Sequence, residues 1–175
     1  MIIHFDKYLI RKFTLNDIDS ISKYANNYLI SKNMRDSFPF PYTREDAEQW
    51  IYFAMNSFDN PILAIADSNE CIGGISAIRQ VDIHRFSAEI GFWIAEPFWN
   101  KGLISKALNV FCSYLFTEFD FNRLFANVFE DNIASQRVLE KNGFFIEGTF
   151  RESVYKGNKF INHHTYSLLK KDFIL

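Results

Sequence analysis

Cysteine is scarce in this 175-residue sequence: Cys71 and Cys112 are its only two, and each stands alone in an apolar segment. Two isolated cysteines do not make a disulfide framework, and they lack the paired spacing of a zinc site. The four histidines do not form a metal pattern either, since His163 and His164 are neighbours that point to opposite faces if they lie in a strand. We expect buried thiols in a reducing compartment and no metal.

Long basic runs and long apolar runs are also missing. Lysine and arginine number 19 against 21 acidic residues, so nucleic acid is not expected as a main partner. No apolar stretch approaches the roughly 18 residues of a membrane span, and the N-terminus lacks the apolar run of a signal peptide. We expect a cytoplasmic protein that does not bind a membrane.

Apolar residues, by contrast, are plentiful, at 48% of the chain with 20 phenylalanines. The length suits one domain over residues 1–175, with a single substantial core. So many aromatic rings also predict aromatic patches on the surface or an apolar pocket.

The first part of the chain predicts a strand and two helices. Residues 8–13 form the strand, and Thr14 begins a capping-box-like helix start whose apolar positions continue to Leu29. Residues 33–42 contain two prolines and are expected to form a loop, and a second helix begins after Thr43.

The next strands are expected to be antiparallel. Residues 62–66 and 71–79 form a hairpin around a polar turn, and Gly73-Gly74 indicates a bulge or a close approach of another backbone. At the end of the chain, residues 144–155 and 163–170 complete the sheet as antiparallel strands.

The stretch with most functional information runs from Ala88 to Phe119. It reads as a strand, a break at Glu96-Pro97, and the turn WNKGLIS that opens a long helix. The first N–H groups of a helix have no partner inside the helix and lie at the positive end of its dipole, so they can bind an anion. A glycine in the turn lets a pyrophosphate approach closely, and Lys101 adds a positive charge. With a further strand at residues 123–129, the stretch predicts a β-α-β unit with a right-handed crossover.

A second informative stretch is EDNIASQRVLEKNGF, residues 130–144. Asn132 suits a helix N-cap, Ser135 the third helical position, and Gly143 the left-handed residue that follows a helix. These structural roles are complete without any function.

Four segments together resemble the GNAT N-acetyltransferases, and within them the RimJ/RimL-like group. They are AEIGFWIAEPFWNKGLISKAL, NIASQRVLEKNGFFIEG, RDSFPFPYTREDAEQWI and EGTFRESVYKGNKFINHHTYSLLKKDF, and they span essentially the whole chain. The resemblance implies an α/β GNAT fold: a mixed, mostly antiparallel sheet of about seven strands flanked by helices, with a splayed central strand pair that takes the coenzyme. It also implies an N-acetyltransferase that uses acetyl-CoA.

Three departures from the family patterns stand out. Trp99 and Ile104 replace the usual first and last residues of the phosphate motif, and Asn162 replaces an aspartate that is common before the last strand. Many members of the superfamily also place a tyrosine near the last helix as general acid. Here no tyrosine occurs between Asp120 and Glu152, so Tyr155 or another distant residue would have to serve.

The resemblance also implies site residues. In the family the asparagine at the position of Asn132 hydrogen-bonds the pantetheine arm, the serine at the position of Ser135 lies near the coenzyme sulfur, and residues of the proline-containing loop border the acceptor. Acceptor contacts are expected from Phe38, Tyr42 and Tyr155. The residues expected to bind the coenzyme are Phe92, Trp93, Ile94, Trp99, Asn100, Lys101, Gly102, Leu103, Ile104, Ser105, Asn127, Asn132, Ser135 and Lys141.

Acyl transfer to an amine requires removal of a proton, because an amine with a pKa of roughly 8 to 10 is mostly protonated at neutral pH. Glu89, the only acid inside the central strand, is the candidate general base, acting directly or through water; the alternative is an ordinary exposed carboxylate. Ser135 is the candidate hydrogen-bond donor to sulfur, and a backbone N–H of residues 92–94 can polarise the thioester carbonyl. Neither cysteine has a nearby histidine in sequence, which favours direct attack in a ternary complex.

The acceptor stays open between two kinds of amine. The N-terminal α-amine of a protein, by analogy with ribosomal-protein acetylation, is the first candidate, and a small amine such as a polyamine or an aminoglycoside is the second. A non-catalytic acyl-CoA-binding module could dispense with Glu89 and Ser135, and both are present. An exposed aromatic face could also support a homodimer.

Overall fold

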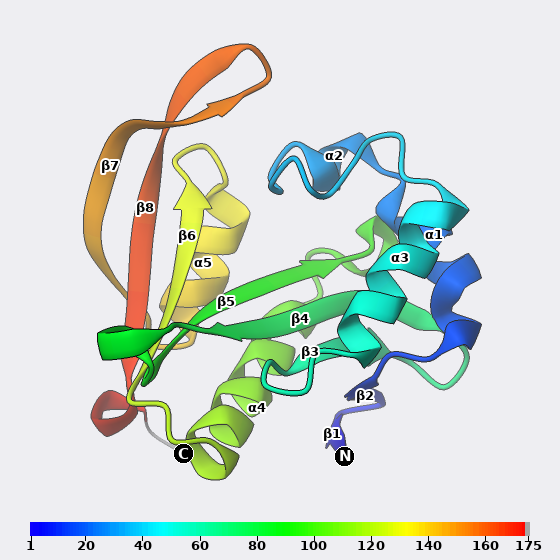
Figure 1. The fold of residues 1–175 in the computed structure, drawn as a ribbon, viewed down its shortest axis with the longest axis horizontal. Coiled ribbons are helices and arrows are strands. Elements are labelled where there is room, and N and C mark those ends of the chain that lie inside the picture. Colours follow the sequence, from blue (N-terminus) through cyan, green and yellow to red (C-terminus); the bar gives the residue numbers. More distant parts are fainter. Residues whose placement is uncertain (174–175) are drawn as a thin grey trace.

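The computed structural model describes residues 1–173 and contains one sheet with the strand order β1-β2-β3-β4-β5-β6-β8-β7 (Figure 1). All neighbouring strands are antiparallel except β5 and β6, which are parallel. This confirms the expected mixed, mostly antiparallel sheet. The strands are β1 (Ile2–Phe5), β2 (Tyr8–Lys12), β3 (Ile62–Ala66), β4 (Cys71–Arg79), β5 (Ser87–Ile94), β6 (Arg123–Phe129), β7 (Phe145–Lys156) and β8 (Lys159–Leu169).

Helices connect and cover these strands. The α-helices are α1 (Ile18–Ala25), α2 (Tyr28–Ser31), α3 (Arg44–Met55), α4 (Leu103–Glu118) and α5 (Ile133–Lys141). Short 3-10 turns are η1 (Leu15–Asp17), η2 (Asp82–His84), η3 (Glu96–Phe98) and η4 (Lys170–Asp172). The helix after β5 and the return into parallel β6 form the expected β-α-β unit.

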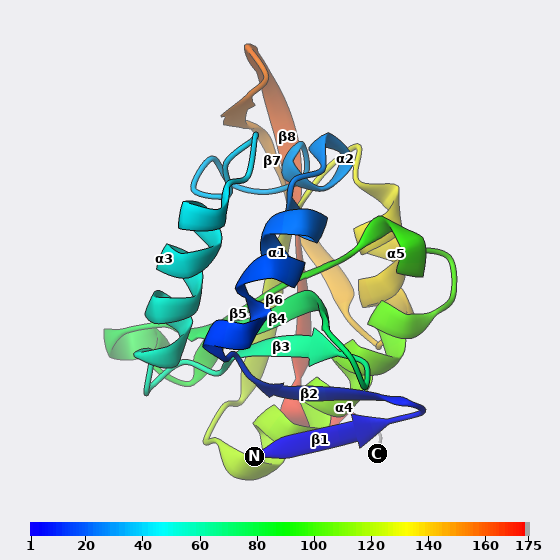
Figure 2. The same cartoon turned by 90° about the vertical axis from the view of Figure 1, so that its right-hand side faces the viewer.

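The sheet has one strand more than expected, because β1 was not anticipated. Its residues pair with β2 across a tight turn in which Asp6 has a φ of 48°. Figure 2 shows this hairpin at the edge of the sheet. Burial alternates along β1, with Ile3 half-buried and Phe5 buried, but the exposed Ile2 removes the apolar–polar alternation from the sequence.

The first helix is shorter than expected. The capping box of Thr14 and Asp17 is confirmed, but helix α1 ends at Ala25, and α2 follows as a single separate turn. Asn27 makes this break: its side chain accepts a hydrogen bond from the N–H of Leu29 at 2.8 Å and donates one to Glu96 at 2.6 Å. Leu29 is consequently exposed rather than part of an apolar helix face.

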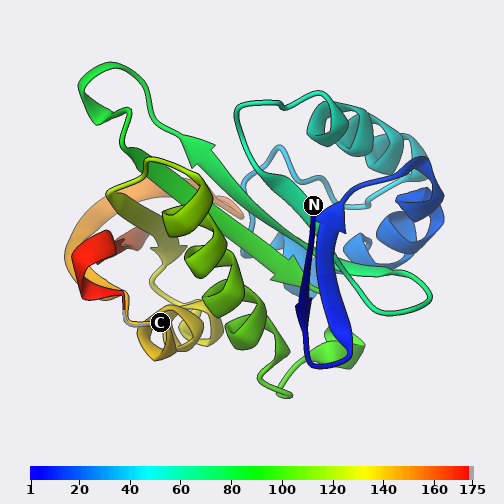
Figure 3. The ribbon, with the colours of Figure 1, turned by 90° about the horizontal axis from the view of Figure 1, so that it is seen from below.

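Two apolar clusters cover the two faces of the sheet. One packs α4 against the strands and contains Ala88, Ile90 and Leu124, and Figure 3 views the molecule from the side of this helix. The other packs α1 and α3 against the opposite face of the N-terminal strands and contains Ile51 and Ala64. Both cysteines are buried and free, as expected.

Gly73 confirms the expected close approach of two backbones. A Cβ atom at this position would lie 2.4 Å from the carbonyl oxygen of Trp93 in β5, and the register of β3 with β4 shifts between Ile65 and Ala66. Gly74 is also constrained, because a Cβ there would lie 2.9 Å from Nε1 of the Trp93 indole.

The centre of the sheet splays apart, as expected. Strands β5 and β6 pair only from Ser87 with Arg123 to Glu89 with Phe125, although β5 continues to Ile94 and β6 to Phe129. Beyond Glu89 the edges of the two strands that face each other therefore have no strand partner. This opening separates the N-terminal part of the sheet from β6, β8 and β7 (Figure 1).

Candidate active site

The turn between β5 and α4 has the geometry of an anion site. Gly102 is the N-cap of α4 with a φ of 69°, and Asn100 is also left-handed with a φ of 59°. The N–H of Lys106 bonds the carbonyl of Gly102 at 3.2 Å, so the N–H groups of Leu103, Ile104 and Ser105 precede the first helical hydrogen bond. A Cβ at Gly102 would meet no atom within 4 Å, so this side of the turn is open.

Trp99, one of the departures from the family pattern, holds this turn in place. Its indole N–H donates to the carbonyl oxygen of Ile94, the last residue of β5, at 2.7 Å. The side chain of Lys101 folds back to the carbonyl of Pro97 at 2.8 Å. The turn is therefore tied to the end of the splayed strand.

Helix α5 lies beside α4 and has a residue expected to bind the coenzyme at each end, Asn132 at the start and Lys141 at the end. At the start, Asn132 caps the helix by accepting from the N–H of Ser135 at 3.3 Å. At the other end, the buried Asn142 donates to Ser105 at 3.0 Å, which places the end of α5, with Lys141, next to the first turn of α4. Asn142 was not recognised in the sequence, where it reads as an ordinary residue before Gly143.

The backbone of β5 faces the opening. The N–H of Ala95 bonds the carbonyl of Ile72 in β4 at 2.8 Å, and N–H groups alternate in direction along a strand. The N–H groups of Phe92 and Ile94 therefore point toward β6, where pairing has ended. The side chain of Trp93 packs on the opposite apolar cluster, so only its backbone lies near the opening.

Glu89 stands where β5 and β6 separate. Ala88 and Ile90 pack toward α4, so Glu89 projects from the other face of the sheet, and its side chain is 20% exposed. Its Oε1 atom accepts from the guanidinium of Arg35 at 2.5 Å and from the amide Nδ2 of Asn127 at 3.2 Å. Asn127, expected to bind the coenzyme, thus contacts the candidate base.

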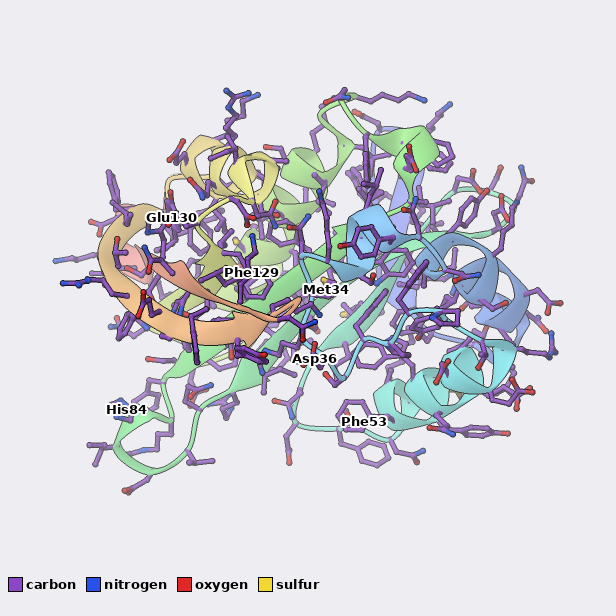
Figure 4. All side chains as sticks on the ribbon, turned by 90° about the horizontal axis from the view of Figure 1, so that it is seen from above. Met34, Asp36, Phe53, His84, Phe129 and Glu130 are labelled. Atoms are coloured by element: carbon purple, nitrogen blue, oxygen red, sulfur yellow. The ribbon has the colours of Figure 1, made fainter. Side chains whose placement is uncertain are left out.

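Residues 33–42 and the tip of the β7-β8 hairpin meet above this face. Lys156, near the tip, pairs with Asp36 of the loop at 2.8 Å. In Figure 4 the hairpin tip lies beside Met34 and Asp36, with Phe129 nearby. Phe38 holds the loop on β5, because its ring packs edge-on against that of Trp93, with the two ring centroids 5.9 Å apart.

The three expected acceptor residues lie in different environments. Phe38 is partly buried between Trp93 and Tyr42. Tyr42 is buried in the core, where desolvation raises its pKa, so its ring supports Phe38 rather than facing solvent. Tyr155 is exposed near the hairpin tip and contacts Phe160; within residues 1–173 it makes no hydrogen bond to Glu89 or Ser135.

The C-terminal part of the same sheet face has no helix over it. In Figure 1 helices α1 and α3 lie over the N-terminal strands, and the short α2 lies with the segment that leads into residues 33–42. Asn127 of β6 and Phe150 of β7 are exposed. Glu89 lies at the edge of this helix-free surface, where Arg35 of residues 33–42 contacts its carboxylate and its side chain is 20% exposed.

Two cavities lie elsewhere. One of about 610 Å³ is lined by Lys23, Tyr24, Asn26, Asn27, Glu96 and Pro97, and one of about 440 Å³ lies beside α4 and Phe173. Neither includes Glu89 or Ser135. Over residues 1–173 there is no helix long and apolar enough to cross a membrane, and no cluster of three or more His, Cys, Asp or Glu side chains that could hold a metal.

Comparison with known proteins agrees with this geometry. Residues 7–145 match the model of the acetyltransferase (GNAT) domain. The uncharacterized N-acetyltransferase YnaD of Bacillus subtilis (strain 168) is 29% identical over 170 residues, covering 94% of this chain and 95% of its own. The ribosomal-protein-serine acetyltransferase of Escherichia coli (strain K12) is 28% identical over 103 residues, covering 59% of this chain and 57% of its own.

Solved structures agree as well. The crystal structure of a GNAT-family acetyltransferase from Bacillus anthracis superposes with a TM-score of 0.85 at 26% identity, covering 98% of this chain and 99% of that one. The chain therefore belongs to the GNAT acetyltransferase family and is an N-acetyltransferase.

Proposed function

We propose that this enzyme transfers an acetyl group from acetyl-CoA to the N-terminal α-amine of a protein. The observation that carries the acceptor is the place of Glu89, on a sheet face whose C-terminal part has no helix over it and below the point where residues 33–42 meet the β7-β8 hairpin. Sites for small molecules are usually concave and bury most of the ligand. An extended peptide, by contrast, needs a long open surface.

The residues around the splay fit acetyl-CoA. The open turn at Gly102 suits a pyrophosphate, because it combines free helix N–H groups with Lys101 and the end of α5 that carries Lys141. The unpaired edge of β5 at Phe92 and Ile94 suits the amide groups of the pantetheine arm. Ser135, in the first turn of α5, suits a contact with the sulfur.

The reaction follows from these positions. Glu89 accepts a proton from the acceptor ammonium, directly or through water, and the neutral nitrogen attacks the thioester carbonyl. The N–H of Ile94 or Phe92 donates to the carbonyl oxygen as negative charge develops there. The new C–N bond forms, the C–S bond breaks, and the thiolate leaves with a hydrogen bond from Ser135. The second amine proton goes to solvent.

The charges near Glu89 favour a peptide over a polycation. The loop and the hairpin tip that meet here carry three basic residues, Arg35, Lys156 and Lys159; Arg35 pairs with Glu89 and Lys156 with Asp36. A polyamine or an aminoglycoside would encounter these cations on entry. The name of the E. coli relative, a ribosomal-protein-serine acetyltransferase, agrees with a protein acceptor.

The test is thiol release from acetyl-CoA with N-terminal peptides, polyamines and aminoglycosides, measured for the wild type and Glu89→Gln. We expect turnover on peptides alone, and a fall in kcat of about 100-fold or more in Glu89→Gln with unchanged coenzyme affinity. Turnover confined to small amines would contradict the acceptor, and full activity in Glu89→Gln would contradict the base.

A further inference from the structure

Glu89 is held through one oxygen only. Both of its hydrogen-bond donors, Arg35 and Asn127, reach Oε1. The hydrogen bonds within residues 1–173 leave Oε2 without a donor. One carboxylate oxygen is therefore fixed, and the other is available to a ligand.

Asn127 is fixed in turn by Thr165. The hydroxyl of Thr165 donates to Oδ1 of Asn127 at 2.7 Å, and Nδ2 of Asn127 donates to Glu89. The orientation of the amide follows from chemistry, because a carboxylate can only accept and its neighbour must be the NH₂ group. The hydroxyl of Thr165 then meets the amide oxygen, to which it must donate.

The sheet register brings these three residues to one face. Thr165 of β8 lies directly opposite Asn127 of β6, and Glu89 pairs with Phe125, two residues before Asn127. Leu124, Ala126 and Tyr166 point to the other face and pack in the α4 cluster. The hydrogen-bonded chain therefore spans three adjacent strands across the splay, so each group is held by rigid backbone.

We propose that Thr165 and Asn127 are positioning residues that aim Oε2 of Glu89 at the acceptor amine. This inference rests on the proposed function, because it assumes Glu89 is the general base. The hydrogen bond from Thr165 fixes the orientation of the Asn127 amide. The hydrogen bonds from Asn127 and Arg35 then fix the orientation of the Glu89 carboxylate. In this proposal Asn127 orients the general base, instead of binding the coenzyme as expected from the sequence.

The test is Thr165→Val, which removes the hydroxyl and keeps a β-branched side chain. Loss of one hydrogen bond that orients the base is expected to lower kcat about five- to tenfold. The KM for the peptide and the Kd for acetyl-CoA should stay within about twofold, because neither ligand loses a direct contact. Thr165→Ser keeps the hydroxyl and should restore the wild-type kcat.

A matched control removes another hydroxyl next to β8. Thr149 of β7 bonds the Nδ1 atom of His164 at 2.8 Å and takes no part in the chain to Glu89. Thr149→Val should leave kcat unchanged. Thr165→Val should cause no further fall in kcat in a Glu89→Gln background, because that variant has no general base for Thr165 and Asn127 to orient.

The outcomes separate the inference from the function on which it rests. An unchanged kcat in Thr165→Val beside a slow Glu89→Gln enzyme would overturn the inference alone. An equal loss in both backgrounds would also overturn it, whereas a fully active Glu89→Gln would remove the base itself. Crystal structures give a readout independent of turnover: the contact between Asn127 and Glu89 should persist in Thr165→Ser and be lost in Thr165→Val.

Discussion

Gly73 lies where β4 passes closest to the backbone of β5. Because Gly73 has no Cβ, it leaves room for the carbonyl oxygen of Trp93, which would lie 2.4 Å from a Cβ at this position. The ring of Trp93 in turn packs against Phe38 in the loop of residues 33–42. One glycine thus contributes to the shape of the site from within the sheet.

Gly73→Ala should destabilise the protein by about 2 kcal/mol, because the new Cβ meets backbone that cannot rotate away. For a chain of this size we expect a fall in Tm of roughly 4–8 °C in a thermal melt. Gly148→Ala is the control, since its Cβ would meet no atom within 4 Å. Equal melting temperatures for Gly73→Ala and the wild type would contradict the close approach.

The cysteines allow a second test at the residue scale. Burial raises the pKa of Cys71 to about 12 and raises the pKa of Cys112 as well. In the unfolded chain both thiols ionise near pH 8.5, so the folded state binds more protons above that pH. Stability should therefore be lost as pH rises beyond about 9. A thiol reagent at pH 8 should label neither cysteine in the native protein and both in denaturant; fast native labelling would contradict their burial.

At the scale of elements, the β7-β8 hairpin is joined to the end of β6 by Asn162. Its Nδ2 donates to Glu130 at 3.0 Å, and its Oδ1 accepts from the N–H of Glu152, a residue with a φ of 49°, at 2.7 Å. An aspartate, common at this position in the family, would keep the second contact but place a carboxylate against Glu130. The departure from the family pattern therefore has a local physical reason.

Asn162→Asp should lower stability at pH 7 by about 1 kcal/mol, through loss of a hydrogen bond and repulsion from Glu130. The expected fall in Tm is roughly 2–4 °C. Adding Glu130→Gln should restore the melting temperature at pH 7. No rescue by this second change would show that the repulsion is not the cause.

At the scale of the whole molecule, local patterns predicted most of the fold. The capping residues Thr14, Thr43 and Asn132, and the left-handed Gly102 and Gly143, mark element boundaries by their own chemistry. The break at Asn27 was missed because the apolar spacing continues past it to Leu29; its cap of Leu29 is local, but its contact with Glu96 joins residues far apart in the chain. β1 was missed because its exposed Ile2 breaks the apolar–polar alternation of the sequence.

In the candidate site, too, some features could be predicted from the sequence and others depend on the assembled fold. The turn at Gly102 and the helix at Ser135 are contiguous in sequence and could be predicted from it and from the family resemblance. The contacts of Glu89 with Arg35, and of Asn127 with Thr165, depend on strand order and loop position, which no local pattern contains. The sheet face without a helix over it, which favours a peptide, is likewise a property of the assembled sheet.

The most direct test of the central claim is to locate the transferred acetyl group on a peptide with both a free N-terminus and an internal lysine. After reaction with acetyl-CoA and the enzyme, fragmentation by mass spectrometry identifies the modified nitrogen. We expect acetylation of the α-amine alone, with little product in Glu89→Gln. Acetylation of the lysine, or of polyamines in preference to the peptide, would contradict it.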